Sequence, residues 1–411
     1  MMKGWKEYKL EEIGDVIMGQ SPPSKFYNED GIGLPFFQGK TEFGELFPTI
    51  KQYTSKTTKE AEKNSVLFTV RAPVGELNIN KVKCCIGRGL ASIKAKYPTE
   101  QRFIFYVLKA NQGAFLARSY GAVYDAINGN DLRKTKINIP VYTNERVKIA
   151  KILSAYDDLI ENNLKRIKLL EEMAQIEFNN WYASNEDFEE VNLGSIIGHE
   201  IGGGWGAEEQ SEEFNKPAYV IRGTDIDELP NGKLEKVPFR FHKKSNLASR
   251  KLHDGDIIFE VSGGSSYEGV AKTLMVTNEL LKQFDNAVMP ASFCKLARPT
   301  ERKYSNFLFL FWRFLRNRRG TEVFEIRSAS NIVNYNWTAF LKFQKIKKPS
   351  DDELKKFNKI VDPIYKQVYN LGNQNQCLKE ARDILLPRLM TGMIDPEKIS
   401  GQAVEKIALE L

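Results

Sequence analysis

Two long stretches of the chain carry apolar residues at alternating steps of three and four. The first, Asn144 to Tyr182, contains no Pro or Gly and places its apolar residues on one helix face. Its stripe is Ile149, Ile152, Tyr156, Leu159, Ile160, Ile167, Leu170, Ala174, Phe178 and Trp181. At ~1.5 Å per residue this helix extends roughly 55 Å, further than one globular domain requires. So long and narrow a stripe predicts a second helix packed along it.

The second stretch, Asp351 to Met393, has the same periodicity. Its stripe is Leu354, Phe357, Val361, Ile364, Val368, Leu371, Leu378, Leu385 and Leu389. Asn375 and Arg382 also fall on this stripe, where polar residues can set the register of paired helices. A proline inside a helix removes a hydrogen bond and clashes with the preceding turn. Pro363 therefore predicts a helix start or kink, and we expect the helix to end near Pro387 to Gly392.

The segments before each long helix combine short β-rich runs with one apolar helix. The runs lie between Gly, Pro and Asn clusters, which favours strands. They are Ser65–Val70, Ile257–Val261 and Phe293–Leu296, and the helices are Glu100–Leu108 and Tyr304–Leu315. This mixture predicts two α+β globular segments, with the strand order left open.

An internal repeat organises the chain. Pro35–Lys40 resembles Tyr219–Thr224, and Asn64–Val70 resembles Gly255–Val261, in the same order within each half. The repeat predicts a globular segment at 1–143, a helix at 144–182, a second globular segment at 183–350, a helix at 351–394 and a tail at 395–411.

Composition excludes some functional classes. Apolar residues at 42% and charged residues at 27% are typical of a globular protein. There is no 18-residue apolar run and no apolar segment at the amino terminus, so we expect a cytoplasmic protein. Four Cys without a C-x-x-C pair indicate packed, reduced thiols, and three isolated His predict no metal site.

The net charge of +7 is concentrated in residues 1–143, which hold 21 Lys and Arg against 14 Asp and Glu. A solvated surface explains such an excess, and so does a polyanionic partner.

Several motifs carry a resemblance to a known family. Ser65–Gly75 (SVLFTVRAPVG) and Cys85–Ala91 (CIGRGLA) resemble motifs of the target-recognition domains in type I restriction-modification specificity subunits. The segment from Gly121 to Pro140 is similar as well, and Ile149–Trp181 and Leu385–Gly392 resemble the family's spacer helices. The second globular segment departs from the pattern, with Ser262-Gly263-Gly264-Ser265 and Met289-Pro290-Ala291-Ser292 at the motif positions.

The resemblance implies a DNA-binding specificity subunit with no catalytic activity of its own. Each recognition domain would read one half of a bipartite, asymmetric target, and the two helices would pack as an antiparallel coiled coil that fixes the spacing. Two methyltransferase (M) subunits, carrying S-adenosylmethionine, would dock on this subunit, and restriction/translocase (R) subunits would complete the complex. This chain itself needs no cofactor. Two reading domains at a fixed distance suit a duplex whose groove repeats every ~34–36 Å.

Residues in the motif loops are the candidates for contact with DNA, because phosphates are met by Lys and Arg and bases by polar side chains on loops. In the first segment these are Ser21, Lys25, Gln38, Lys40, Arg71, Arg88, Tyr120 and Asn128. In the second they are Arg222, Thr224, Ser262, Ser265, Ser292, Arg327 and Asn331. A surface or fold-stabilising role is the alternative for each, and Arg71 in particular could be structural.

The first long helix has apolar residues outside its main stripe. Leu153, Leu164, Leu169 and Met173 form this excess, which predicts contact with partner helices, and Leu169 and Met173 are the predicted partner-binding residues. The alternative is a wider stripe covered by the globular segments.

Two other functional classes stay open. A coiled-coil scaffold whose globular ends bind protein would share the same helices. An ATPase is disfavoured, because Gly33–Thr41 has five residues between its glycines where a phosphate-binding loop has four.

Overall fold

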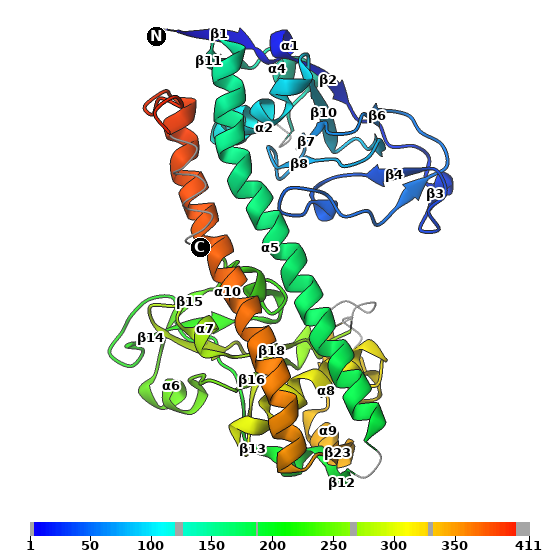
Figure 1. Ribbon diagram of the computed structural model, residues 1–411, viewed down its shortest axis with the longest axis vertical. Helices are drawn as coiled ribbons and strands as arrows, with labels where there is room; N and C mark the ends of the chain where they lie inside the picture. The colour runs from blue at the N-terminus through cyan, green and yellow to red at the C-terminus, as the bar shows by residue number, and fades with distance from the viewer. Residues whose placement is uncertain (1–3, 120–125, 186–187, 264–268, 328–331, 400–411) are drawn as a thin grey trace. The chain divides into compact units, whose positions relative to one another are not determined.

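The computed structural model describes residues 4–119, 126–185, 188–263, 269–327 and 332–399. The chain forms two compact units: unit 1 comprises Met1–Glu161 with Leu378–Leu411, and unit 2 comprises Asn162–Cys377. The long helices α5 (Thr143–Ser184) and α10 (Asp351–Met390) contribute residues to both units (Figure 1). Both units mix helices and strands, so the α+β prediction is confirmed at that level.

Unit 1 is built on an antiparallel sheet in the order β2-β10-β7-β8. Its strands are β2 (Gly14–Met18), β7 (Val66–Thr69), β8 (Leu77–Ile79) and β10 (Leu90–Ala95). Strand β7 is buried along its whole length, because helix α2 (Gln101–Ala110) lies against this sheet and places Phe103 and Tyr106 in the core. The β-rich run and the helix predicted for this segment are therefore confirmed.

A second sheet of unit 1 has the order β3-β5-β4-β9-β6, in which β4 and β9 are parallel. Strands β1 and β11 form a separate antiparallel pair. The bounds are β1 Trp5–Lys9, β3 Tyr27–Asn28, β4 Leu34–Phe37, β5 Tyr53–Thr54, β6 Glu60–Ala61, β9 Cys84–Ile86, β11 Lys136–Pro140, α1 Leu10–Ile13, α3 Gln112–Ser119 and α4 Gly129–Arg133.

Unit 2 is built on an antiparallel sheet in the order β13-β20-β16-β18. Helix α8 (Ser305–Asn317) supplies Trp312, whose ring lies 5.4 Å from that of Phe259 on β16. Smaller sheets have the orders β15-β14-β19, with β14 and β19 parallel, β17-β22-β21, and β12-β23.

The remaining bounds of unit 2 are β12 Glu189–Asn192, β13 Ile197–Gly202, β14 Lys216–Ile221, β15 Phe239–His242, β16 Ile257–Glu260, β17 Ser262–Gly263, β18 Thr273–Met275, β19 Ala287–Pro290, β20 Cys294–Pro299, β21 Glu325–Arg327, β22 Val333–Tyr335, β23 Lys345–Lys348, α6 Lys244–Arg250, α7 Asn278–Leu281 and α9 Trp337–Phe343.

Each unit pairs one end of α5 with the opposite end of α10. In unit 1, Asp157 of α5 forms an ion pair with Arg382 of α10. In unit 2, the ring of Trp181 stacks on that of Phe357 with centroids 4.3 Å apart.

Helix α10 continues through Pro363 and Pro387, so of the predicted start or kink at Pro363 the start is wrong, and the kink stays a prediction. Val361, Ile364 and Tyr365 are all buried around Pro363, and this packing outweighs the one hydrogen bond that proline removes. The helix ends at Met390, within the predicted range.

Two further observations bear on the sequence predictions. Cys84, Cys85 and Cys294 are buried, but Cys377 is exposed, so the prediction of four packed thiols is wrong for that residue. Across the described ranges, no helix has the length and apolarity needed to cross a lipid bilayer.

Candidate nucleic-acid interface

Four of the predicted DNA-binding residues of unit 1 line one cavity of about 210 Å³. Gln38 and Lys40 follow the end of β4, Arg71 follows β7, and Arg88 follows β9. Because each of these strands is buried and apolar, it holds the polar residues after its end at the surface. The complete lining is Gln38, Gly39, Lys40, Thr69, Arg71, Ala72, Pro73, Arg88 and Gly89.

Backbone hydrogen bonds hold these turns together. Gly87 N donates to Phe37 O at 2.8 Å, and Val70 N donates to Gly89 O at 2.9 Å. A Cβ on Gly89 would lie 2.3 Å from Gln38 O, so only glycine allows this approach. The cavity wall is therefore set by backbone contacts rather than by flexible side chains.

The cavity is cationic. Arg71 and Arg88 are exposed, and neither forms an ion pair with a residue in the described part of the chain. Lys40 Nζ lies 2.6 Å from Glu76 Oε1, but both side chains stay substantially exposed, which makes this a weak and exchangeable pair. Exposed guanidinium groups beside amide and hydroxyl groups provide the donors that DNA phosphates and bases accept.

The other predicted residues of unit 1 behave differently. Ser21 Oγ accepts a hydrogen bond from Arg88 N at 3.2 Å, so it supports the turn. Lys25 is exposed beside the Phe26 ring and does not line the cavity. The Asn128 side chain accepts from the backbone N–H groups of Asn130 and Asp131, and thereby caps α4. Tyr120 lies outside the described residues.

In unit 2, three of the five predicted residues that the structure describes are engaged within the chain. The Arg222 guanidinium donates to Asp225, at 3.0 and 2.8 Å, and to Lys236 O at 2.9 Å, and the Asp225 carboxylate raises its pKa. Ser262 Oγ donates to Asn334 Oδ1 at 2.7 Å, and Arg327 lies 3.7 Å from Glu325. Thr224 and Ser292 are exposed. Ser265 and Asn331 lie outside the described residues.

Sequence reasoning missed a buried acid in unit 2. Glu260 ends β16 with 5% of its surface exposed, and within the described residues its Oε2 has no hydrogen-bond partner. A Cβ on Gly223 would lie 2.2 Å from Glu260 Oε1, so the carboxyl rests on the turn that also carries Arg222 and Thr224. Burial raises its pKa. In the sequence, Glu260 could have been recognised as an acidic residue directly after the apolar run Ile257–Phe259.

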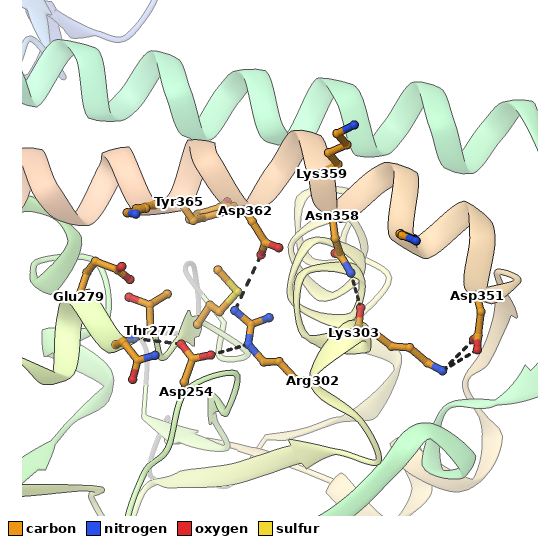
Figure 2. A pocket seen from close by; sticks show the side chains of 14 residues that line it. Asp254, Thr277, Glu279, Arg302, Lys303, Asp351, Asn358, Lys359, Asp362 and Tyr365 are labelled. Carbon is orange, nitrogen blue, oxygen red and sulfur yellow. Dashed lines mark hydrogen bonds and ion pairs between the residues drawn. The ribbon is translucent and has the colours of Figure 1, made fainter.

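A larger cavity of unit 2, about 770 Å³, lies beside the first half of α10 (Figure 2). Figure 2 shows Arg302 between Asp254, at 2.7 Å, and Asp362, at 3.8 Å. Lys303 pairs with Asp351 at 2.8 Å, and this hydrogen bond raises the pKa of the lysine. These ion pairs help to attach α10 to the rest of unit 2.

No group of three His, Cys, Asp or Glu side chains in the described ranges is placed to hold a metal ion.

Comparison with known proteins agrees with these observations. A family model for the type I restriction modification DNA specificity domain matches residues 2–172. The putative type I restriction enzyme MjaX specificity subunit of Methanocaldococcus jannaschii is 42% identical over 172 residues, which span 40% of this chain and only 40% of that relative. The type I restriction enzyme MjaIX specificity subunit of the same organism is 26% identical over 97% of this chain and 95% of its own. Residues 2–172 of this chain are thus similar to the type I restriction-modification DNA specificity domain.

The chain also resembles a solved structure over nearly its whole length. The crystal structure of a type I restriction-modification S subunit from M. genitalium matches with a TM-score of 0.55 at 17% identity, covering 94% of this chain and 96% of that one. At this identity the match shows the fold alone.

An apolar patch lies on the part of α5 that belongs to unit 2. Leu169 and Met173, the predicted partner-binding residues, are 63% and 50% exposed. Ile176, which the prediction missed, is 58% exposed. It follows Leu169 by seven residues and Met173 by three, and this helical spacing in the sequence could have identified it. Leu153 is instead buried in unit 1, so the prediction that it adds free apolar surface is wrong, because the globular core covers it.

Proposed function

We propose that this chain is a specificity subunit that binds double-stranded DNA and directs a type I enzyme to a bipartite, asymmetric sequence, with each unit reading one half. The observation that carries the proposal is the cavity of unit 1, where Gln38, Lys40, Arg71 and Arg88 converge at three strand ends. The subunit performs no catalysis. It requires no cofactor, because methylation uses S-adenosylmethionine on the partner subunits.

The hydrogen-bond pattern of the two units supports a pseudo-two-fold repeat. The main sheets have corresponding orders, β2-β10-β7-β8 and β13-β20-β16-β18, and each unit has one parallel pair, β4–β9 or β14–β19. Gly87 N donates to Phe37 O in unit 1, and Ala291 N donates to Ile221 O in unit 2. Different side chains at corresponding turns would read different half-sites, which makes the target asymmetric.

The long helices would form an antiparallel coiled coil that sets the spacing between the half-sites. Support comes from α5 and α10, which each contribute to both units, and from the polar residues Asn375 and Arg382, which are buried on the α10 stripe. The exposed patch of Leu169, Met173 and Ile176 is the proposed docking surface for a methyltransferase subunit. Two such methyltransferase subunits, together with restriction/translocase subunits, complete the complex. The cytoplasmic location stays a prediction.

The test is DNA binding by the subunit assembled with its methyltransferase partner. Affinity should fall steeply with salt, with a log–log slope of about −0.9 for each phosphate contacted. Arg71→Ala and Arg88→Ala should each weaken binding or change the methylated sequence, while the melting temperature stays unchanged. Lys96→Ala, an exposed cation at the opposite end of β10, is the matched control. If DNA binding does not depend on salt and neither arginine variant alters it, the alternative is favoured, in which the chain is a coiled-coil scaffold whose globular ends bind protein.

A further inference from the structure

Corresponding backbone hydrogen bonds show which residues of unit 2 occupy the positions of the unit 1 cavity. Val70 N donates to Gly89 O at 2.9 Å, and Val261 N donates to Phe293 O at 2.9 Å. Leu90 N donates to Gly87 O, and Cys294 N donates to Ala291 O. Phe293 therefore stands in unit 2 where Gly89 stands in unit 1.

These two positions differ in what they can hold. A Cβ on Gly89 would collide with Gln38 O at 2.3 Å, so unit 1 carries no side chain there. In unit 2 the same position carries a phenyl ring that is 61% exposed. Within the described part of the chain this ring makes no aromatic or cation–π contact, whereas Phe239 and Phe241 of the neighbouring β15 both do. The ring is thus presented to the surface rather than packed.

The turn that presents this ring is rigid. Phe293 O accepts hydrogen bonds from Val261 N at 2.9 Å and from Ser262 N at 3.2 Å, and Cys294 is fully buried at the start of β20. The exposed hydroxyl residue Ser292 precedes the ring in the same turn. A large apolar side chain on a hydrogen-bonded turn, beside an exposed hydroxyl group, is the arrangement expected of a contact residue.

We propose that Phe293 determines specificity in unit 2 by packing its ring against the 5-methyl group of a thymine in the half-site that this unit reads. The inference rests on the proposed function. The thymine methyl is the apolar group that the base edges present in the major groove, and phenylalanine is among the side chains that contact it. Apolar wedges that unstack bases belong mainly to proteins that bend DNA through the minor groove. No basic side chain replaces Arg88 at this turn of unit 2, so apolar contact takes over part of the reading there.

The experiment combines a base change with a residue change. Methylome sequencing first defines the target of the subunit assembled with its methyltransferase partner. Each thymine of each half-site is then replaced by uracil, which removes only the methyl group. The affinity of the assembled enzyme for each duplex is measured for the unsubstituted chain, for Phe293→Ala, and for Phe343→Ala. Phe343 is a control of equal exposure, at 63%, at the end of α9.

One uracil in one half-site should weaken binding of the unsubstituted chain about fourfold, the effect of one buried methyl group. Phe343→Ala should keep that penalty and Phe293→Ala should lose it, with both melting temperatures unchanged. The role of Phe293 is ruled out if neither half-site contains a thymine, or if no uracil substitution weakens binding. It is also ruled out if uracil weakens the binding of Phe293→Ala as much as that of the unsubstituted chain. A lower melting temperature of Phe293→Ala would show a structural role instead. If the unsubstituted assembly binds no split sequence at all, the proposed function fails instead.

Discussion

Arg382 of α10 and Asp157 of α5 form an ion pair inside unit 1, where only 5% and 3% of their surfaces are exposed. The Tyr106 hydroxyl of α2 also donates a hydrogen bond to Asp157, so the carboxylate joins three helices. Burial and the neighbouring carboxylate raise the pKa of the Tyr106 hydroxyl, which keeps it protonated as a donor. A slip of α10 by one turn would separate Arg382 from the buried Asp157 carboxylate, and this cost sets the helix register within unit 1.

Removing one partner of this pair should destabilise unit 1 strongly. Arg382→Met leaves the Asp157 carboxylate buried without its cation, and we expect the free energy of unfolding to fall by about 3–5 kcal/mol in chemical denaturation. The double change Asp157→Leu with Arg382→Met should recover most of the loss. Lys168→Met, which breaks the exposed pair with Glu172, is the control and should have little effect. If Arg382→Met lowers the free energy of unfolding as little as Lys168→Met does, the buried pair does not fix the register.

The apolar patch of α5 should be required for assembly. Leu169→Lys with Met173→Lys places two charges in the proposed contact and should abolish copurification with the methyltransferase subunit, because an unpaired charge cannot be buried cheaply. Both residues are exposed, so the melting temperature of the isolated chain should not change. Lys168→Glu, a charge change on an adjoining face of the same helix, should leave copurification intact. Normal copurification of the double variant would place the docking surface elsewhere.

The thiols should divide into one reactive and three protected groups. Cys377 is exposed, whereas Cys84, Cys85 and Cys294 are buried, and burial raises the pKa of Cys84 to about 12. Since the thiolate is the reactive form, a thiol reagent at mildly alkaline pH should label one cysteine of the folded chain quickly and the others only after unfolding. Mass spectrometry of the labelled peptides identifies the site. Rapid labelling of Cys84 would contradict the packing described for β9.

Stability should depend on pH through Glu260. Burial raises the pKa of this carboxyl and Asp227 adds to the effect, while the opposing charges of Lys272 and Arg316 reduce it. Above the ordinary Glu pKa of about 4.3, the folded chain then holds a proton that the unfolded chain has lost, so the free energy of unfolding falls as pH rises through that window. Glu260→Gln should flatten this dependence, as measured by the melting temperature of unit 2 across the same window. Identical pH profiles would show that Glu260 titrates normally.

The parts of the fold that periodicity specifies were predictable from the sequence. Helix α5 was expected from Asn144 to Tyr182 and runs from Thr143 to Ser184, because an unbroken apolar stripe leaves little alternative. Pro363 was misjudged because the local rule ignores packing: the buried residues around it keep α10 intact. Leu153 was misjudged for a related reason, since a stripe does not show which globular surface covers its flank.

The site was predictable only in part. Gln38, Lys40, Arg71 and Arg88 were identified as motif residues, and the strand ends that bring them together could be known only from the fold. Asn128 and Arg222 are polar loop residues like the others, but their side chains cap a helix and pair with Asp225, and composition cannot distinguish these roles. Glu260 and Phe293 went unnoticed because their importance depends on which turns they face.

Methylome sequencing of DNA modified by the subunit assembled with its methyltransferase partner tests the central claim most directly. We expect one asymmetric target in two parts, separated by a constant number of unspecified bases, and Arg71→Ala should alter only one part. A continuous or palindromic target, or a substitution in one unit that alters both parts, would contradict it.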